Sequence, residues 1–247
     1  MSYEPPLTDG EREALVDLYA DLRVTDVTDG LDFHGFGYDL NQLSPDIRPL
    51  YRDTDAFSHR IVGFAHTMRF LPTNRRRELP AELGFESVSA WRDEWYGELS
   101  GGPTDIRTHD VIVCAAHEIP VGIIGSANAL GWVADGAVGV VTDGGPRDTD
   151  ELILQDIPTY SRTINKPIIP GRTEFDAEQI PVNVGGAQVR PDDVIVADGD
   201  GVVVVPIEHA EAVGEAARRE QADDQETRRR LYERAGLEPD FTLEQDD

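Results

Sequence analysis

Arg147 and Asp148 stand side by side in the segment VVTDGGPRDTDEL, residues 140–152, where an apolar run ends in two glycines and a proline. Arginine binds a carboxylate through two parallel hydrogen bonds. A single aspartate with several waters is a normal coordination for Mg²⁺. The pair therefore predicts a catalytic centre for a 2-oxo acid such as pyruvate, with Asp148 as the metal ligand. A charged surface turn is the alternative interpretation.

An anion-binding helix start is expected upstream of this pair. A strand ends at Gly125, and a short helix follows, for which Ser126 is the expected cap. The first-turn amides of residues 127–129 then have no partner inside the helix, and they favour a carboxylate or phosphate. The chain crosses back through a further strand, which brings Arg147 and Asp148 to a strand end, where α/β sheets tend to bind ligands.

Composition narrows the class of protein. The chain has 247 residues, 39% of them hydrophobic, which suits one large domain with appendages. No apolar run reaches the roughly 20 residues of a membrane span, and the N-terminus lacks the layout of a signal peptide. The single cysteine, Cys114, lies in an apolar run and is expected to be buried. We expect a cytoplasmic protein that does not bind a membrane.

The charge balance is strongly acidic. The net charge is −26, with 21 arginines and one lysine. Nucleic acid is not an expected partner, because a phosphate-binding face needs clustered basic residues. Such acidity suits a salt-rich cytoplasm, where screening reduces self-repulsion. A halophilic source is therefore our hypothesis, and it predicts that the free energy of unfolding rises in molar salt.

The scarcity of lysine also bears on mechanism. A Schiff-base aldolase needs a lysine nucleophile, and the only lysine is Lys166, which precedes a proline and is expected at the surface. A metal-dependent route is therefore favoured. The histidines show no metal-binding spacing and are expected to be structural or surface residues. Trp91 and Trp95 are expected to pack against the core, and the DGDG segment at 198–201 to form a hairpin turn.

Apolar patterning predicts an α/β fold with more than one small sheet. The segment 73–107 is polar and rich in arginine and glutamate, and we interpret it as a partly helical insertion outside the central core. We expect one domain over residues 1–206, with N-terminal helices and this insertion, and a charged helical extension over 207–247. The expected strands are 60–72, 110–116, 121–125, 138–143 and a pair around 198–201, with short strands or extended segments at 157–163, 166–169 and 181–189. The expected helices are 8–22, 25–32, 126–136 and 207–237.

The segment GSANALGWVADGAVGVVTDGGPRDTDEL resembles a family signature: a glycine, a spacer of about twenty residues, then Arg-Asp-x-x-Glu/Asp. Gly125, Arg147, Asp148 and Glu151 fit it. The family contains the regulator of ribonuclease activity A and the class II 4-hydroxy-4-methyl-2-oxoglutarate and 4-carboxy-4-hydroxy-2-oxoadipate aldolases. The resemblance covers roughly residues 20–72 and 108–206. It implies a β/β/α swivelling, phosphohistidine-domain-like fold with added N- and C-terminal helices, assembled as a homotrimer or homohexamer.

The resemblance also implies roles for individual residues. The substrate loop is formed by Gly125, Ser126, Ala127 and Asn128. Arg147 contacts the substrate carboxylate, Asp148 binds Mg²⁺ or Mn²⁺, and Glu151 helps to fix the turn.

The chain departs from the aldolase pattern at one place. The aldolases usually carry Asp or Glu directly after the loop glycine, and here that place is Ser126. The missing acid puts the aldol reaction in doubt. Asp143 is one substitute, and Glu220 or Glu226 of a neighbouring subunit is another.

Two functions of different classes follow. The first is a metal-dependent lyase that cleaves a 4-hydroxy-2-oxo acid, or decarboxylates oxaloacetate, to give pyruvate. The second is a non-catalytic regulatory protein that binds a ribonuclease or another protein partner. A lyase or hydratase for a different oxo acid is a third possibility.

Overall fold

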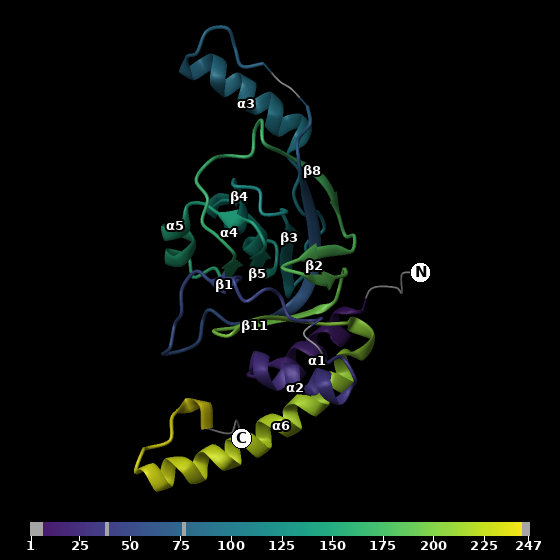
Figure 1. Ribbon diagram of the computed structural model, residues 1–247, viewed down its shortest axis with the longest axis vertical. Coiled ribbons are helices and arrows are strands. Elements are labelled where there is room, and N and C mark those ends of the chain that lie inside the picture. Colours follow the sequence, from purple (N-terminus) through teal and green to yellow (C-terminus); the bar gives the residue numbers. More distant parts are fainter. Residues whose placement is uncertain (1–6, 38–39, 76–77, 244–247) are drawn as a thin grey trace.

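The computed structural model describes residues 7–37, 40–75 and 78–243, and its central feature is an eight-stranded mixed sheet (Figure 1). The strand order is β1 (Arg48–Pro49), β7 (Thr159–Ser161), β5 (Ala137–Thr142), β3 (Asp110–Ala115), β2 (Ile61–Pro72), β11 (Val194–Asp198) and β12 (Gly201–Val205). The remaining strand, β8 (Thr173–Glu178), pairs with the C-terminal half of β2. The end strands β1 and β12 contact each other, so the sheet curls into a nearly closed barrel.

The middle of the sheet is parallel and buried on both faces. Strands β2, β3, β5 and β7 pair in parallel, whereas β11 and β8 run antiparallel to β2. Successive side chains of a strand point to opposite faces, so Val111 and Val113 pack inside the barrel while Ile112 and Cys114 pack outside it. Covering both faces explains the continuous apolar sequence of β3, and burial of Cys114 is confirmed.

Two small sheets and two helices complete the body of the fold. The hairpin of β9 (Val182–Val184) and β10 (Ala187–Val189) adds its valines to the barrel interior. Outside β3 and β5 lie β4 (Gly122–Ile124), α4 (Ser126–Ala134), β6 (Gly145–Pro146) and α5 (Thr149–Leu154). This outer layer contains the turn that carries Arg147 and Asp148. The predicted turn at 198–201 is confirmed, because it joins β11 to β12.

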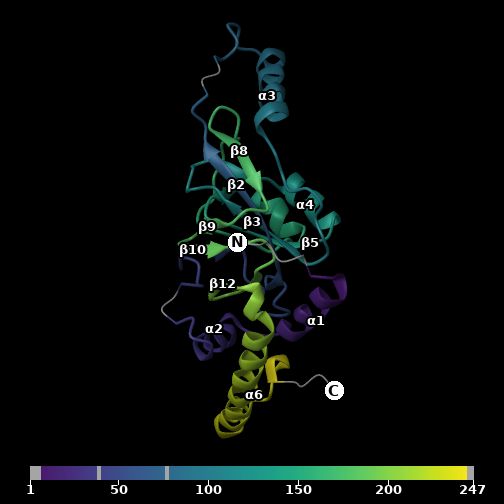
Figure 2. The ribbon, with the colours of Figure 1, turned by 90° about the vertical axis from the view of Figure 1, so that its right-hand side faces the viewer.

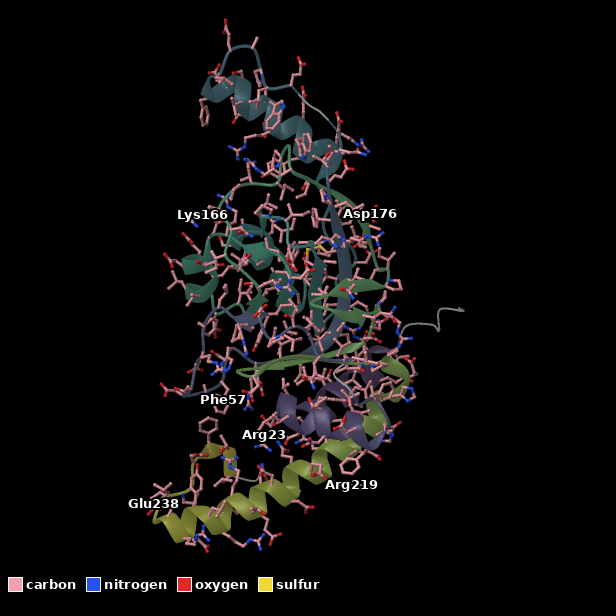
Figure 3. All side chains as sticks on the ribbon, viewed as in Figure 1. Arg23, Phe57, Lys166, Asp176, Arg219 and Glu238 are labelled. Atoms are coloured by element: carbon pink, nitrogen blue, oxygen red, sulfur yellow. The ribbon has the colours of Figure 1, made fainter. Side chains whose placement is uncertain are left out.

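Three helices form a layer that packs against strands β11 and β12 (Figure 2). They are α1 (Asp9–Tyr19), α2 (Val24–Phe33) and α6 (Ala210–Ala235). Thr8 begins α1 with a capping box to Glu11. Short 3₁₀ turns, η1 (Ile207–His209) and η2 (Phe241–Leu243), flank α6. The η2 segment folds back so that the Phe241 ring lies 5.0 Å from the Phe57 ring (Figure 3). Among the helices of the described residues, none is long and apolar enough to cross a bilayer.

The insertion forms helix α3 (Phe85–Leu99), which projects beyond the sheet next to β8 (Figure 1). Trp95 is 0% exposed, and its Nε1 donates to the Thr173 carbonyl at 3.2 Å. The Trp91 ring packs 6.0 Å from the Trp95 ring, so Trp91 contacts its neighbour in the same helix. The insertion projects from the central sheet, and the buried Trp95 indole anchors α3 to the edge of that sheet.

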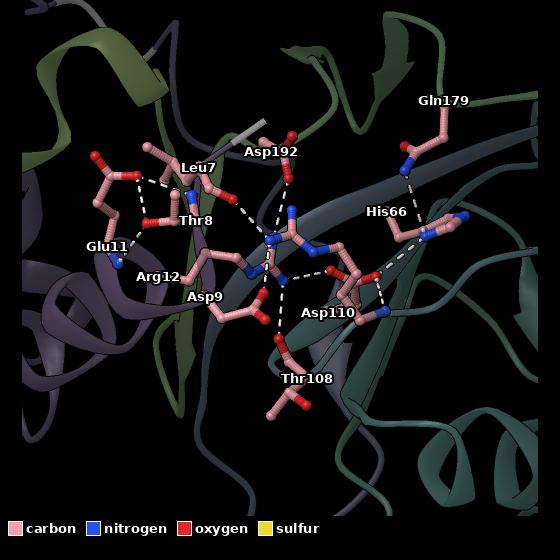
Figure 4. Close-up of polar contacts among 11 residues, drawn as sticks. Leu7, Thr8, Asp9, Glu11, Arg12, His66, Thr108, Asp110, Gln179 and Asp192 are labelled. Atoms are coloured by element: carbon pink, nitrogen blue, oxygen red, sulfur yellow. Dashed lines mark hydrogen bonds and ion pairs between the residues drawn. The ribbon is translucent and has the colours of Figure 1, made fainter. Parts of the chain in front are cut away.

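A buried polar network ties α1 to the middle of the sheet (Figure 4). Arg12 is 2% exposed and donates to Asp110 at 2.6 Å, to Asp192 at 3.0 Å and to the Thr108 carbonyl at 2.9 Å. The His66 ring lies between Asp110, at 3.2 Å, and Glu178, at 3.1 Å. The structural role expected for His66 is confirmed by this enclosure.

The His66 contacts predict a pH-dependent stability. Burial lowers the pKa of His66, but hydrogen bonds and charges from Asp110 and Glu178 outweigh burial, so the pKa is raised. A raised folded-state pKa means that protonated His66 contributes stability that is fully present below about pH 6.5 and is lost as the pH rises through the folded pKa. We expect the free energy of unfolding to fall between about pH 6 and pH 8 more steeply in the wild type than in His66→Gln. Urea unfolding across this range measures both slopes, and equal slopes would contradict the expectation.

Candidate active site

The turn that carries the Arg-Asp pair is held beside the start of α4 by the backbone. Strands β4 and β6 pair in parallel, with Gly122 opposite Gly145. The Arg147 amide donates to the Ile124 carbonyl at 2.8 Å. Asp148 then adopts a left-handed conformation, with φ of 54°, as the residue that precedes α5. Aspartate tolerates this conformation better than most residues, so the sequence suits the turn.

Helix α4 begins one residue earlier than expected. The prediction that Ser126 caps this helix is wrong, because Gly125 is the N-cap and its carbonyl accepts from the Ala129 amide at 3.1 Å. Ser126 is therefore the first helical residue. The amides of residues 126–128, rather than 127–129, form no hydrogen bond within the described residues. These three unpaired donors and the helix dipole favour an anion at this end of α4.

The Arg147 and Asp148 side chains meet directly in front of Gly125. The Arg147 Nε donates to Asp148 Oδ1 at 3.2 Å, and the two side chains are 34% and 38% exposed. A Cβ atom on Gly125 would lie 2.9 Å from Asp148 Oδ2, and a Cβ on Gly122 would lie 2.8 Å from the Arg147 Cβ. The two glycines therefore leave the space that the charged pair occupies. Both charges remain accessible from a neighbouring pocket.

This pocket has a volume of about 310 Å³, the scale of a small-molecule site. Of the residues predicted to bind substrate, Gly125, Ala127, Asn128 and Arg147 line it, whereas Ser126 does not. Asp148, the predicted metal ligand, also lines the pocket. Sequence reasoning missed the rest of the lining, which consists of Met68, Phe70, Arg92, Tyr96, Ser100, Gly101, Gly122, Ile123, Trp132, Ile168 and Ile169. Four of these belong to the insertion, namely Arg92, Tyr96, Ser100 and Gly101.

Other residues considered from the sequence lie away from the pocket. The Glu151 carbonyl accepts from the Gln155 amide at 2.9 Å, but its side chain is exposed and makes no hydrogen bond with a described residue, so no side-chain contact of Glu151 fixes the turn. Asp143 is buried and accepts the Ala116 amide at 2.7 Å, and burial raises the pKa of its carboxyl. It therefore does not replace the missing acid. Lys166 is exposed and does not line the pocket (Figure 3), as expected for a surface lysine.

The donor set of the pocket fits one kind of metal. Over the described residues, no three histidine, cysteine, aspartate or glutamate side chains gather closely enough to hold an ion. Asp148 is the one carboxylate among the described residues that line the pocket. A lone, accessible carboxylate suits Mg²⁺ or Mn²⁺, because waters and substrate oxygens complete their coordination. It does not suit a closed zinc site, which needs four protein ligands.

Comparison with known proteins identifies the family. The family model described as RraA-like, Aldolase/RraA, matches residues 24–204, and the chain belongs to this family. The resemblance to this family is thereby confirmed, and the fold is the RraA-type fold with added N- and C-terminal helices.

Two curated relatives match part of the chain. A protein of Halalkalibacterium halodurans named "Putative 4-hydroxy-4-methyl-2-oxoglutarate aldolase" is 32% identical over 109 residues, which is 44% of this chain and 49% of that protein. Protein DlpA of Legionella pneumophila is 23% identical over 155 residues, or 62% of this chain and 23% of that protein. The chain thus spans about half the length of the first relative and about a quarter of the second.

Solved structures resemble the fold over nearly its full length. An uncharacterized protein from Pseudomonas syringae pv. tomato superposes with a TM-score of 0.69 at 25% identity, covering 96% of this chain and 97% of that one. Streptomyces coelicolor RraAS2, described as an unusual member of the RNase ES inhibitor RraA protein family, superposes with a TM-score of 0.68 at 24% identity, covering 92% and 99%.

Proposed function

We propose that this protein is a lyase that binds a 2-oxo acid with Mg²⁺ or Mn²⁺ and releases pyruvate. The substrate is either a 4-hydroxy-2-oxo acid, cleaved by a retro-aldol reaction, or oxaloacetate, which loses CO₂. The observation that carries the proposal is the convergence of the α4 amides, Arg147 and Asp148 on one pocket. Membership of the Aldolase/RraA family supports it at the level of the family.

In the proposed reaction, residues of the chain would bind the substrate carboxylate and stabilise the negative charge of the enolate. The amides of Ala127 and Asn128 and the Arg147 guanidinium would hold the carboxylate next to the keto group. Both reactions break the bond to carbon 3 and leave the pyruvate enolate, whose negative charge Arg147 would face. Bound at Asp148, Mg²⁺ or Mn²⁺ would supply further positive charge at the keto oxygen. A water held by Arg147 would return a proton to carbon 3.

The proposal is tested by assaying both substrates. The purified chain is incubated with oxaloacetate or with 4-hydroxy-4-methyl-2-oxoglutarate, each with Mg²⁺, Mn²⁺ or EDTA, and pyruvate is measured with lactate dehydrogenase. The assay is run in dilute buffer and in molar salt, because the net charge of −26 favours screening. We expect pyruvate only when metal is present. No pyruvate from either substrate under any of these conditions would overturn the proposal.

A regulatory protein is the second candidate, favoured by Ser126 and by the absence of a second carboxylate among the described residues of the pocket wall. In that case the chain would act by binding a ribonuclease or another protein through its surface. Capture of a ribonuclease, together with no pyruvate release, would favour this alternative.

The homotrimer or homohexamer implied by the resemblance is part of the main proposal, since a neighbouring copy would place Glu220 or Glu226 near the site. Light scattering measures the mass of this assembly.

The close approach at Gly125 predicts a selective defect in Gly125→Ala. The added Cβ would lie 2.9 Å from Asp148 Oδ2. That oxygen ends an accessible side chain, so the carboxylate can swing away at little cost in stability, but it then leaves the pocket. We expect pyruvate release to fall about tenfold or more, with the melting temperature nearly unchanged. Gly131→Ala in the same helix is the matched control, because nothing lies within 4 Å of its Cβ position. Equal activity of the two variants would contradict the expectation.

A further inference from the structure

Arg92 is a second arginine on the pocket wall, contributed by helix α3 of the insertion. Its Nε is buried and has no hydrogen-bond partner. No hydrogen bond or ion pair joins its guanidinium to another residue in the described part of the chain. The buried Arg12, in contrast, has carboxylate partners at 2.6 Å and 3.0 Å. Arg92 is therefore a cation without a partner among the described residues.

An unpaired, partly desolvated guanidinium is unfavourable unless an anion or a hydrogen-bond acceptor pairs with it. The described residues of the chain carry many carboxylates, yet none of them forms an ion pair with Arg92, although the net charge is −26. Because Arg92 lines the same pocket as Arg147, an anion bound in the pocket is the group placed to pair with it. The insertion adds Tyr96 and Ser100 as further polar groups on this wall.

The charges on the wall indicate how many negative groups the ligand carries. The charged residues among the described lining are Arg92, Arg147 and Asp148, which gives two positive charges and one negative. A divalent cation bound to Asp148 would make the net charge of the pocket more positive. A ligand with two carboxylates therefore suits the pocket better than one with a single carboxylate. Met68 and Phe70 provide apolar surface for the carbon chain of such a ligand.

We infer that Arg92 binds the distal carboxylate of a 2-oxo dicarboxylic acid whose 2-oxo carboxylate end is held by Arg147 and the start of α4. The inference rests on the proposed function and adds a residue that determines its specificity. Arginine forms two parallel hydrogen bonds to a carboxylate, so helix α3 sets the specificity of the pocket for dicarboxylates over monocarboxylates.

The same contact selects between the two pyruvate-forming reactions. In the retro-aldol reaction the bond between carbons 3 and 4 breaks, its electron pair forms the pyruvate enolate, and the hydroxyl on carbon 4 loses its proton to water and becomes a carbonyl. The distal carboxylate stays charged in the second product, so Arg92 stabilises it throughout. In decarboxylation the distal carboxylate itself gives up its charge and leaves as CO₂, so pairing with Arg92 opposes the step. Arg92 therefore favours retro-aldol cleavage of a 4-hydroxy-2-oxo dicarboxylic acid.

Binding of two unreactive ligands tests the inference directly. The probes are 2-oxoglutarate, which lacks the 4-hydroxyl needed for cleavage, and 2-oxopentanoate, which has a methyl group in place of the distal carboxylate. Both are titrated into the full chain with Mg²⁺ by calorimetry. We expect the wild type to bind 2-oxoglutarate about 10- to 100-fold more tightly, as one charge-assisted contact provides. Arg92→Gln should abolish this difference while leaving the 2-oxopentanoate affinity unchanged, and Arg92→Lys should retain part of it.

Control variants separate the possible failures. Arg75→Gln removes an arginine near the start of the insertion whose side chain pairs with Glu174 and does not line the pocket, and it should bind both ligands like the wild type. Arg147→Gln should weaken both ligands alike. If the wild type binds the two ligands with equal affinity, or if Arg92→Gln weakens the binding of both ligands equally, the proposed role of Arg92 is overturned. The proposed function would still stand in that case. If neither ligand binds the wild type, the proposed function fails with it.

Turnover gives a second readout that a merely structural role would not produce. In Arg92→Gln, kcat/KM for 4-hydroxy-4-methyl-2-oxoglutarate should fall about 10- to 100-fold, whereas kcat for oxaloacetate should stay the same or rise. A parallel loss of both reactions would show that Arg92 supports the fold rather than the specificity.

Discussion

Replacing Asp148 with asparagine is expected to lower the rate of pyruvate release by about 10²- to 10³-fold, as the loss of one key electrostatic group does in other active sites. The amide has nearly the shape of the carboxylate, and asparagine tolerates the left-handed conformation at this position. The change therefore removes the negative charge without disturbing the turn. What is lost is the one carboxylate among the described pocket-lining residues, and with it the ligand for Mg²⁺ or Mn²⁺.

Two measurements make this prediction specific. The binding of Mn²⁺, followed by electron paramagnetic resonance, should weaken in Asp148→Asn together with the loss of turnover. Asp150→Asn is the matched control, because Asp150 is an exposed acid in the next helical turn and does not line the pocket. Undiminished turnover in Asp148→Asn, or an equal loss in both variants, would show that Asp148 does not hold the metal.

Replacing Asp110 with alanine is expected to destabilise the fold by about 3–5 kcal/mol, the usual cost of removing one partner of a buried ion pair. Asp110 is 3% exposed and contacts both Arg12, at 2.6 Å, and His66, at 3.2 Å. Its removal leaves the buried Arg12 guanidinium with Asp192 as its remaining carboxylate partner. Urea unfolding at about pH 6, where unperturbed histidine is largely protonated, measures the loss.

The expected loss at Asp110 comes from the unpaired charge, and a double variant tests this cause. Changing Arg12 to methionine and Asp110 to leucine together should recover much of the stability, because an apolar pair of similar volume avoids the desolvation of two charges. Asp9→Ala, which breaks an exposed ion pair to Arg107 in the same part of the molecule, should change stability little. A double variant no more stable than Asp110→Ala would show that packing, not charge, sets the cost.

Local patterns made much of the fold predictable. The continuous apolar runs of β3 and β5, and the glycine and proline turns around them, appear in short windows of sequence because each reflects contacts within one strand or one turn. The turn at 198–201 was predicted for the same reason. Strand β8 was missed because its sequence, TEFDAE, is polar, with Phe175 as its one large apolar residue, and its pairing with β2 joins residues about a hundred positions apart.

The sequence by itself determined the class of the protein and the core of its candidate site. The glycine at 125 and the Arg-Asp pair at 147–148 are close in the chain, so their spacing and residue types were sufficient to predict that they form one site. Only the tertiary structure decided that the unpaired amides are those of residues 126–128 and that α3 brings Arg92 to the same pocket. The physical reason is that Arg92 reaches the pocket through a helix anchored by the burial of Trp95 against β8, a contact between segments far apart in the chain.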